Sequence, residues 1–405
     1  MKITKLSLAA IAAMAFTTAQ ADMVSNVKLD SQAKVWYETW DKGDNELFDQ
    51  GSAGADAVLK VGGTANVGPL KVGAVNYTVT TLGLEQSIVS GIRTARSGAN
   101  DTDNWFGEAY VEGGIGQTTL KLGRQSLNTP FAFTENWNAV PNTFEAVVAA
   151  NKDIENVTLI GAMIKKGNSA GNFKVADNGE FSELDASMVG VSAKFGSVPV
   201  NAYYYDVNNI AKFGTGSASD ITAYWLDATA PVGPAKVTAI YANAYSQASN
   251  EDNAVPAFGI KATGKVNTVS LLAAYSTVDG NEKAVNAGKT AGTMAIANVA
   301  TGFKKTKLPT AGVYTDGLYV AQPGSNAFKL KAATKLAGFG VAAQVINNTN
   351  DIMKNKETTE FDLIVSKKIG NASIKGIFLN RSFEDEATDK SAGGNHVRVI
   401  AAYNF

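Results

Sequence analysis

The 405-residue chain contains no cysteine and a single histidine, His396. A secreted chain of this composition is stabilised without disulfides, and metal sites built on Cys or His are excluded. Beyond the N-terminal segment there is no run of about 18 consecutive apolar residues, which excludes crossing a membrane by α-helices. These absences leave a β-barrel as the way to cross one, because strand alternation hides apolar surface from hydropathy windows.

The N-terminal segment has the features of a secretory signal peptide. Lys2 and Lys5 form a charged n-region, residues 6–16 an apolar h-region, and a small-residue pattern ends at Ala21. The apolar run is too short for a retained anchor. Cleavage after residue 21 takes the formal charge from −1 to about −3, because two lysines and no acid are removed. That balance favours binding neither to nucleic acid nor to an anionic membrane surface.

The remaining chain, residues 22–405, is expected to be one domain of alternating strands. In the last ten residues, Val397, Val399 and Tyr403 lie on one face, whereas His396 and Arg398 lie on the other. Many strands put small and aromatic apolar residues on one face and full charges on the other, which suits a wet lumen better than a dry core. The final aromatic residue, Phe405, is typical of a transmembrane barrel rim.

The sequence predicts an all-β transmembrane up-and-down antiparallel barrel of about 18 strands, with 16 as the alternative. Tight turns containing Gly, Pro or Asn alternate with long polar segments, as in outer-membrane barrels. A phase shift over residues 76–81 predicts a bulge. The segment from residue 280 to 325 is interpreted as a loop, although an extra hairpin within it stays open. The short turns are expected near residues 67–69, 113–116, 195–199, 231–234, 264–267, 337–340 and 369–371.

The third long segment is unusually aromatic for a solvated loop. It contains Phe131, Phe133, Trp137 and Phe144 as well as two prolines. We expect residues 128–145 to fold into the lumen and narrow it. The alternative is a loop packed at the outer rim or in an oligomer contact.

Four residues near this loop are the predicted pore constriction: Lys121, Arg124, Glu135 and Glu145. The two glutamates are expected to face cations on the opposite wall. Arg124 shares the parity of the outward-facing Leu122, so it lies either at the extracellular interface or on a bulge near Gly123 that turns it inward. We favour the bulge, because a lipid-facing Arg near the midplane costs roughly 2–4 kcal/mol.

The sequence contains few residues that could carry out catalysis. A hydrolase would need Ser and His within reach of each other, and the lone His396 is interpreted as a polar lining residue, so the protein is not expected to be an enzyme. No cofactor is expected. Calcium bound by loop carboxylates remains open, for example at Asp41, Asp44 and Glu46, although solvated loop acids are the favoured interpretation.

The stretch from Leu122 to Glu145, with L-G-R-Q-S-L-N-T-P followed by V-P-N-T-F-E-A, resembles the third-loop region of OprD-like outer-membrane porins of Gram-negative bacteria. The resemblance implies an 18-stranded barrel, a pore narrowed by the third loop, and often a trimer. It also implies a ladder of basic residues on one wall. By strand order the matching positions are Lys329, Lys331, Arg381 and Arg398, and we add Lys335.

The sequence therefore predicts an outer-membrane porin for passive diffusion of small hydrophilic solutes and ions, in contact with outer-membrane lipid and lipopolysaccharide. A homotrimer is expected. The alternative is a structural or adhesive barrel whose long loops bind surfaces or partners. Charges along the lumen set ion selectivity, but the sequence leaves the sign at the narrowest point open. The ladder is rich in Lys, which acts as a point charge. Bidentate binding of a carboxylate, which needs the two parallel N–H groups of Arg, therefore does not follow from the resemblance.

Overall fold

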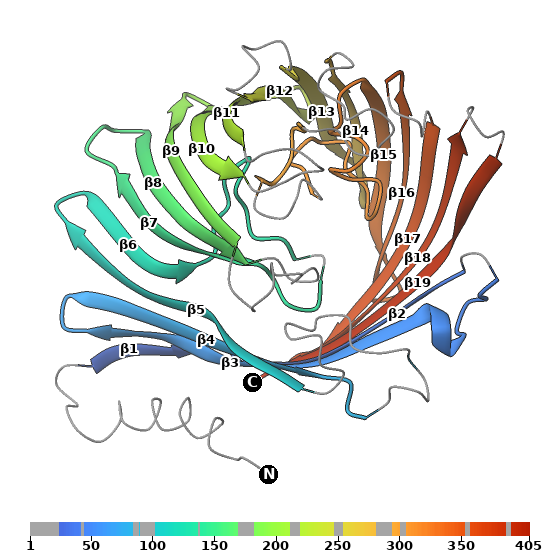
Figure 1. Ribbon diagram of the computed structural model, residues 1–405, viewed down its shortest axis with the longest axis horizontal. Helices are drawn as coiled ribbons and strands as arrows, with labels where there is room; N and C mark the ends of the chain where they lie inside the picture. The colour runs from blue at the N-terminus through green and yellow to red at the C-terminus, as the bar shows by residue number, and fades with distance from the viewer. Residues whose placement is uncertain are drawn as a thin grey trace.

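The computed structural model of the chain describes residues 24–41, 44–83, 89, 102–136, 138–168, 182–210, 219–246, 254–280, 294–299, 305–352, 357–385 and 390–405. These residues form one antiparallel β-sheet rolled into a barrel (Figure 1). The predicted signal peptide lies outside the described residues. Among the described residues, no helix is long and apolar enough to cross a membrane.

The described part of the chain forms strands of 6 to 15 residues. The first two, β1 and β2, both pair with β3 and are successive parts of one stave interrupted at Asp30 and Ser31. The barrel therefore has 18 staves, as the sequence predicts. The strands are β1 Val24–Leu29, β2 Gln32–Trp40, β3 Ala53–Val67, β4 Leu70–Thr80, β5 Thr102–Ile115, β6 Thr118–Gln125, β7 Thr143–Asn151, β8 Val157–Asn168, β9 Ser182–Phe195, β10 Val198–Ile210, β11 Ser219–Val232, β12 Ala235–Ser246, β13 Ala257–Val266, β14 Val269–Val278, β15 Ser325–Leu336, β16 Phe339–Asn350, β17 Glu357–Ile369, β18 Ala372–Asp385 and β19 Lys390–Asn404.

The last strand closes the ring on the first stave. β19 pairs with β2 from His396 opposite Trp40 to Asn404 opposite Gln32, and the two strands lie side by side in Figure 1. Each remaining strand pairs with its neighbours in the sequence. This pairing closes the sheet on itself along β2, and closure is the condition for a sheet to cross a hydrocarbon layer.

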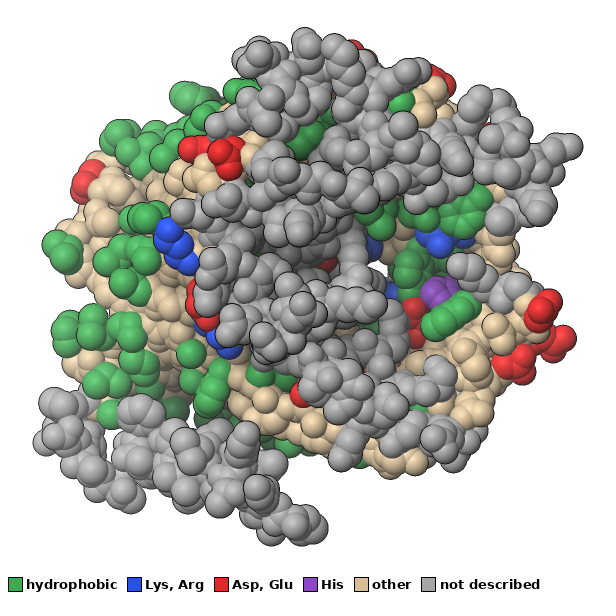
Figure 2. All heavy atoms as spheres, in the orientation of Figure 1, with side chains coloured by type: hydrophobic (Ala, Val, Ile, Leu, Met, Phe, Trp, Pro, Cys, Tyr) green, Lys and Arg blue, Asp and Glu red, His purple; other side chains and the backbone are tan. Residues whose placement is uncertain are grey.

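The two faces of the barrel differ in chemistry, as β15 illustrates. Phe328 and Leu330 are 44% and 53% exposed on the outer face. Lys329 and Lys331, which alternate with them along the strand, point inward and are less exposed. Figure 2 shows hydrophobic side chains along the outer edge of the barrel. The inner face buries acids, among them Glu38, Glu360 and Asp362. An apolar exterior and a charged interior invert the arrangement of a soluble barrel.

The connections between strands differ in length at the two ends of the barrel, as the sequence predicts. At one end the strands are joined by short turns, and at the other by long loops. One of them, Ala337-Gly338, has φ values of 50° and 80°, and this left-handed pair matches the twist of the flanking strands. A bulge lies beside the predicted one but in the partner strand: β4 and β5 change register between Val75 and Asn76, where the extra residue is Gly107 of β5 and not a residue of 76–81.

The contrast between faces predicts the effect of one added charge. Leu330→Arg, at the middle of the outer face of β15, should destabilise the barrel in lipid vesicles by roughly 2–4 kcal/mol. Urea-driven unfolding followed by tryptophan fluorescence measures this cost. Lys331→Arg, one position along and facing inward, should change the unfolding free energy little. Equal costs for the two variants would contradict the assignment of faces.

Candidate functional site

The third loop, residues 126–142 between β6 and β7, is anchored inside the barrel by an aromatic side chain. Phe131 is 1% exposed, and its ring lies edge-on to Tyr205 of β10 and Trp225 of β11 at centroid distances of 5.4 and 6.2 Å. Edge-to-face contacts of this kind add to the stabilisation from burial. The loop therefore enters the lumen and reaches the wall formed by β10 and β11 (Figure 1).

The same loop also reaches the opposite wall. Ala139 and Val140 are buried against Trp36 of β2, Tyr77 of β4 and Trp105 of β5. The third loop thus crosses the lumen, and the prediction that it folds inward is confirmed. Trp137, one of the aromatic residues behind that prediction, lies outside the described residues.

A second inward structure was not predicted from the sequence. We call residues 294–299 and 305–323, which lie between β14 and β15, the inner segment. Met294, Ile296 and Leu308 are buried with Phe131 in the main apolar cluster. The backbone N–H of Val299 donates to the carbonyl of Phe131 at 2.9 Å. The third loop and the inner segment therefore form one packed structure in the lumen.

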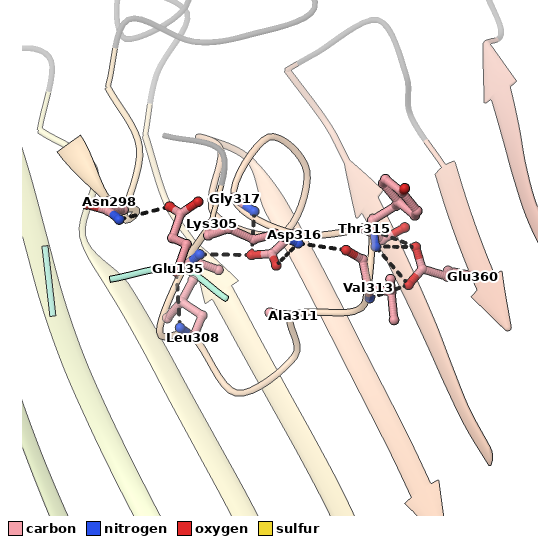
Figure 3. Close-up of polar contacts among 12 residues, drawn as sticks. Glu135, Asn298, Lys305, Leu308, Ala311, Val313, Thr315, Asp316, Gly317 and Glu360 are labelled. Carbon is pink, nitrogen blue, oxygen red and sulfur yellow. Dashed lines mark hydrogen bonds and ion pairs between the residues drawn. The ribbon is translucent and has the colours of Figure 1, made fainter. Parts of the chain in front are cut away.

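Glu135 lies in the contact between these two structures. Its carboxylate accepts a 2.8 Å hydrogen bond from Asn298 Nδ2, which also donates to the carbonyl of Phe133 (Figure 3). The side chain is 6% exposed. The expectation that Glu135 faces cations on the opposite barrel wall is therefore wrong, because the inner segment occupies the intervening space.

Nearby, burial lowers the pKa of Lys307, and the charge of Glu135 opposes this. The ammonium of Lys307 donates to Asn128 Oδ1 at 2.7 Å and lies 4.4 Å from the centre of the Phe133 ring. These contacts give the inner segment a second polar attachment to the third loop.

A buried ion pair shapes the inner segment from within. Lys305 Nζ lies 2.8 Å from Asp316 Oδ2, and Asp316 Oδ1 accepts the backbone N–H groups of Thr306 and Gly317 at 2.8 Å each. Burial raises the pKa of Asp316, while Lys305 and the two N–H donors oppose the rise. The carboxylate joins two parts of the segment that lie ten residues apart (Figure 3).

A wall carboxylate holds the tip of the inner segment. Glu360 of β17 is fully buried and accepts three consecutive backbone N–H groups, from Val313 at 2.6 Å, Tyr314 at 3.1 and 3.2 Å, and Thr315 at 2.6 Å (Figure 3). Successive N–H groups in a turn form a concave anion site. A Cβ at Gly312 would lie 2.3 Å from Glu360 Oε1, so glycine at this position lets the carboxylate approach the turn closely.

The side chain of Tyr314 joins a cluster on the closing seam. Arg398 of β19 donates through Nε to Glu38 Oε2 of β2 at 2.9 Å and through Nη2 to the Tyr314 hydroxyl at 2.5 Å, and Tyr314 in turn donates to Glu38 Oε1. The Arg398 guanidinium lies over the rings of Trp36 and Tyr314. The Tyr314 ring also lies 4.7 Å from His396.

The predicted basic wall divides into covered and uncovered residues. Lys329 donates to the carbonyl of Ala311 in the inner segment, and Arg381 lies over the rings of Tyr319 and Phe383 at 5.3 and 4.5 Å. Together with Arg398, these two residues contact the inner segment or its aromatic neighbours. Lys331 and Lys335 lie further along β15, and Lys335 is exposed.

Acidic side chains lie among the basic residues of this wall. In the strand pairings Lys329 and Arg381 lie on the same row as Glu360, and Lys331 lies on the row of Gln344 and Asp362. The wall is therefore a mixture of charges.

The other predicted constriction residues are not brought together across the channel. Arg124 Nη2 pairs with Glu145 Oε1 of the adjacent strand at 2.6 Å. The expected bulge near Gly123 is absent from the pairing, since β6 pairs with β5 and β7 without a shift. Arg124 thus keeps the parity of the exposed Leu122, and the Arg124–Glu145 pair neutralises the outer rim. The interfacial alternative, which we disfavoured, fits better.

Lys121 faces the lumen, as predicted, with its ammonium 3.7 Å from the centre of the Tyr110 ring. A polar cavity of about 540 Å³ lies between the third loop and the wall of β2–β5. Its charged lining residues are Lys34, Lys60 and Glu108. Lys60 pairs with Asp30, and Ser126 of the third loop donates to Glu108 at 2.5 Å. The cavity therefore places charges of both signs beside the third loop.

Metal ligands are scarce in the part of the chain that the structure describes, where no group of three His, Cys, Asp or Glu side chains could hold an ion. Asp41, one of the loop acids considered for calcium, accepts hydrogen bonds from the backbone and side-chain N–H groups of Asn395. It therefore links the β2 and β19 ends.

The fold can be compared with solved structures. Acinetobacter baumannii OccAB1 superposes with a TM-score of 0.71 at 16% identity, covering 95% of this chain and 99% of that one. Pseudomonas aeruginosa OpdK, solved with vanillate, gives 0.67 at 11% identity over 94% and 98%. A BenF-like porin from Pseudomonas fluorescens Pf-5 gives 0.66 at 12% identity over the same shares.

No protein-family model matches the chain, and no curated protein matches it significantly. The likeness to the solved structures extends over nearly the whole of both chains. At the level of the fold, the resemblance to OprD-like porins is therefore confirmed: the chain is a closed 18-stranded antiparallel barrel of the kind seen in OccAB1, OpdK and the BenF-like porin.

Proposed function

We propose that the protein is an outer-membrane porin, a water-filled channel for passive diffusion of small hydrophilic solutes and ions. The observation that carries the proposal is a closed barrel with an apolar outer face and a charged lumen, into which the third loop and the inner segment fold. Barrels of 16 to 18 strands leave an aqueous channel. The mechanism needs no covalent chemistry.

Ion and solute preference follow from the charges that line the path. Lys34, Lys60 and Glu108 line one cavity from the wall of β2–β5, opposite the third loop. Charges of both signs side by side on one wall can orient a passing zwitterion or carboxylate. OpdK was solved with vanillate, and a carboxylate of this kind is a suitable test solute here.

The same arrangement bears on the two alternatives. His396 lies against the rings of Trp40 and Tyr314 and 3.5 Å from Glu38, as expected for a polar residue that lines the closing seam. An adhesive barrel has no need of a polar path through the lumen. Assembly as a homotrimer and contact with lipopolysaccharide stay predictions.

The purified protein in planar lipid bilayers should give discrete conductance steps, because water fills the path beside the third loop. Reversal potentials in a potassium chloride gradient report which ion passes more easily. A folded, heat-modifiable protein that gives no steps, while its producing cells attach to surfaces normally, would favour the adhesive alternative instead.

Charge removal at the cavity should change the ion preference. Lys34→Gln and Lys60→Gln should each shift the reversal potential toward cation selectivity, with the anion-to-cation permeability ratio falling roughly two- to fivefold, because each removes a cation from the narrowed path. Lys335→Gln removes an equal charge at the exposed end of β15 and serves as the control. An equal shift in all three variants would contradict a selectivity set at this cavity.

Loosening the third loop should widen the channel. Phe131→Ala removes the ring that anchors the loop to β10 and β11, a truncation that costs about 3–5 kcal/mol at a buried site. We expect a larger and noisier single-channel conductance, measured in the same bilayers. Phe328→Ala, on the outer face, is the matched control and should conduct as the parent does. Unchanged conductance in Phe131→Ala would show that the loop stays in place without its anchor.

A further inference from the structure

The turn from Gly312 to Thr315 is a small structure with its own attachment to the barrel wall. The N–H of Gly312 donates to the carbonyl of Thr315 at 2.7 Å, which closes the turn. The three following N–H groups point at Glu360, as described above. Three consecutive N–H groups converge on the two oxygens of one wall side chain, so Glu360 positions the backbone of the turn.

Tyr314 projects from this turn onto Arg398. The Arg398 side chain is 6% exposed and lies between two rings, with its guanidinium carbon 4.7 Å from the centre of Trp36 and 5.1 Å from that of Tyr314. Trp36 belongs to the wall strand β2, whereas Tyr314 belongs to the inner segment. Only the tyrosine can therefore move away without disrupting the barrel.

The contacts at the base of the turn also hold it in place. Asp316 follows the turn directly and is tied to Lys305 and to the backbone of Thr306, so the turn is supported by a folded base. Between that base and the tip, Glu360 is the barrel residue that receives the N–H groups. The tip is therefore held to the wall by Glu360 through its backbone and by Glu38 and Arg398 through the Tyr314 hydroxyl.

We propose that residues 312–315 form a latch held by Glu360, and that Tyr314 is a specificity-determining residue because it covers Arg398. With the latch closed, the Arg398 guanidinium is shared between Glu38 and the Tyr314 hydroxyl and is shielded from solutes. With the latch released, its remaining N–H groups face the lumen, where a planar guanidinium can bind a passing carboxylate at two points. This role in selectivity rests on the proposed porin function, but the latch itself does not.

The latch can be tested by chemical modification of arginine, which needs no conductance. Folded protein in detergent is treated with phenylglyoxal, and the rate of modification is followed by peptide mass spectrometry. Arg398 should react slowly in the parent and at least about tenfold faster in Glu360→Gln, which keeps the size of the side chain but loses its charge. Arg124, remote from the turn, is the internal reference.

Two further variants sharpen the result. Tyr314→Ala removes the cover directly and should expose Arg398 at least as much, whereas Glu112→Gln removes a lumen acid that pairs with Lys71 and should leave the Arg398 rate unchanged. Combining Tyr314→Ala with Glu360→Gln should add little, because both release the same cover. Each variant is first checked for heat-modifiable mobility as evidence of folding, and Tyr314→Ser, which also removes the ring, replaces Tyr314→Ala if that variant does not fold.

Fast modification of Arg398 in the parent would overturn the latch, as would an unchanged rate in both Glu360→Gln and Tyr314→Ala. Single-channel recordings then address selectivity separately. If modification rises but no variant conducts, the latch stands and the porin function fails. If the variants conduct and modification rises without any shift of reversal potential toward anions, the latch stands but Tyr314 does not determine specificity.

Discussion

The structure depends on one constraint, the requirement that every backbone N–H and C=O group of a sheet in hydrocarbon be paired within the sheet. The pairing of β19 with β2 meets it by closing the ring. Closure at this size has a consequence for the interior. A ring of about eight strands can fill its centre with side chains, whereas one of 16 to 18 cannot. The lumen must therefore hold water, or additional chain, or both.

The lumen of this protein holds additional chain, the third loop and the inner segment, as well as space for water. The backbone groups of this additional chain must also be hydrogen-bonded. In the part of the chain that the structure describes, the third loop and the inner segment form no strands with the wall. Their polar groups are satisfied partly by backbone bonds within and between the two structures and partly by side chains. Asn298 donates a hydrogen bond to the backbone of the third loop. Asp316 accepts one from the backbone at the base of the inner segment, and Glu360 accepts one from the backbone at its tip. An unpaired buried charge or amide costs far more than a paired one gains. These three side chains thus determine where the inner structures lie.

The sequence predicts what local pattern controls and misses what distant pairing controls. Alternation in β15 and β19, the turn chemistry at Gly338 and the aromatic content of the third loop each act over a few residues, and each led to a correct feature. Glu135 and Arg124 were misplaced because their partners, Asn298 and Glu145, are set by the way loops meet and by strand register. The inner segment itself left a signal, since the apolar run from Met294 to Val299 is out of place in a solvated loop.

The same distinction changes how the charges of the lumen should be counted. Summing the basic residues of β15, β18 and β19 suggests a strongly cationic wall. Glu38 pairs with Arg398, and backbone groups of the inner segment contact both Lys329 and Glu360. A charge that is paired and covered contributes little field to the path, because its counter-charge lies a few ångströms away. Lys34, Lys60 and Glu108 line the polar cavity beside the third loop, so the ion preference of the channel should follow these residues and the state of the turn over Arg398.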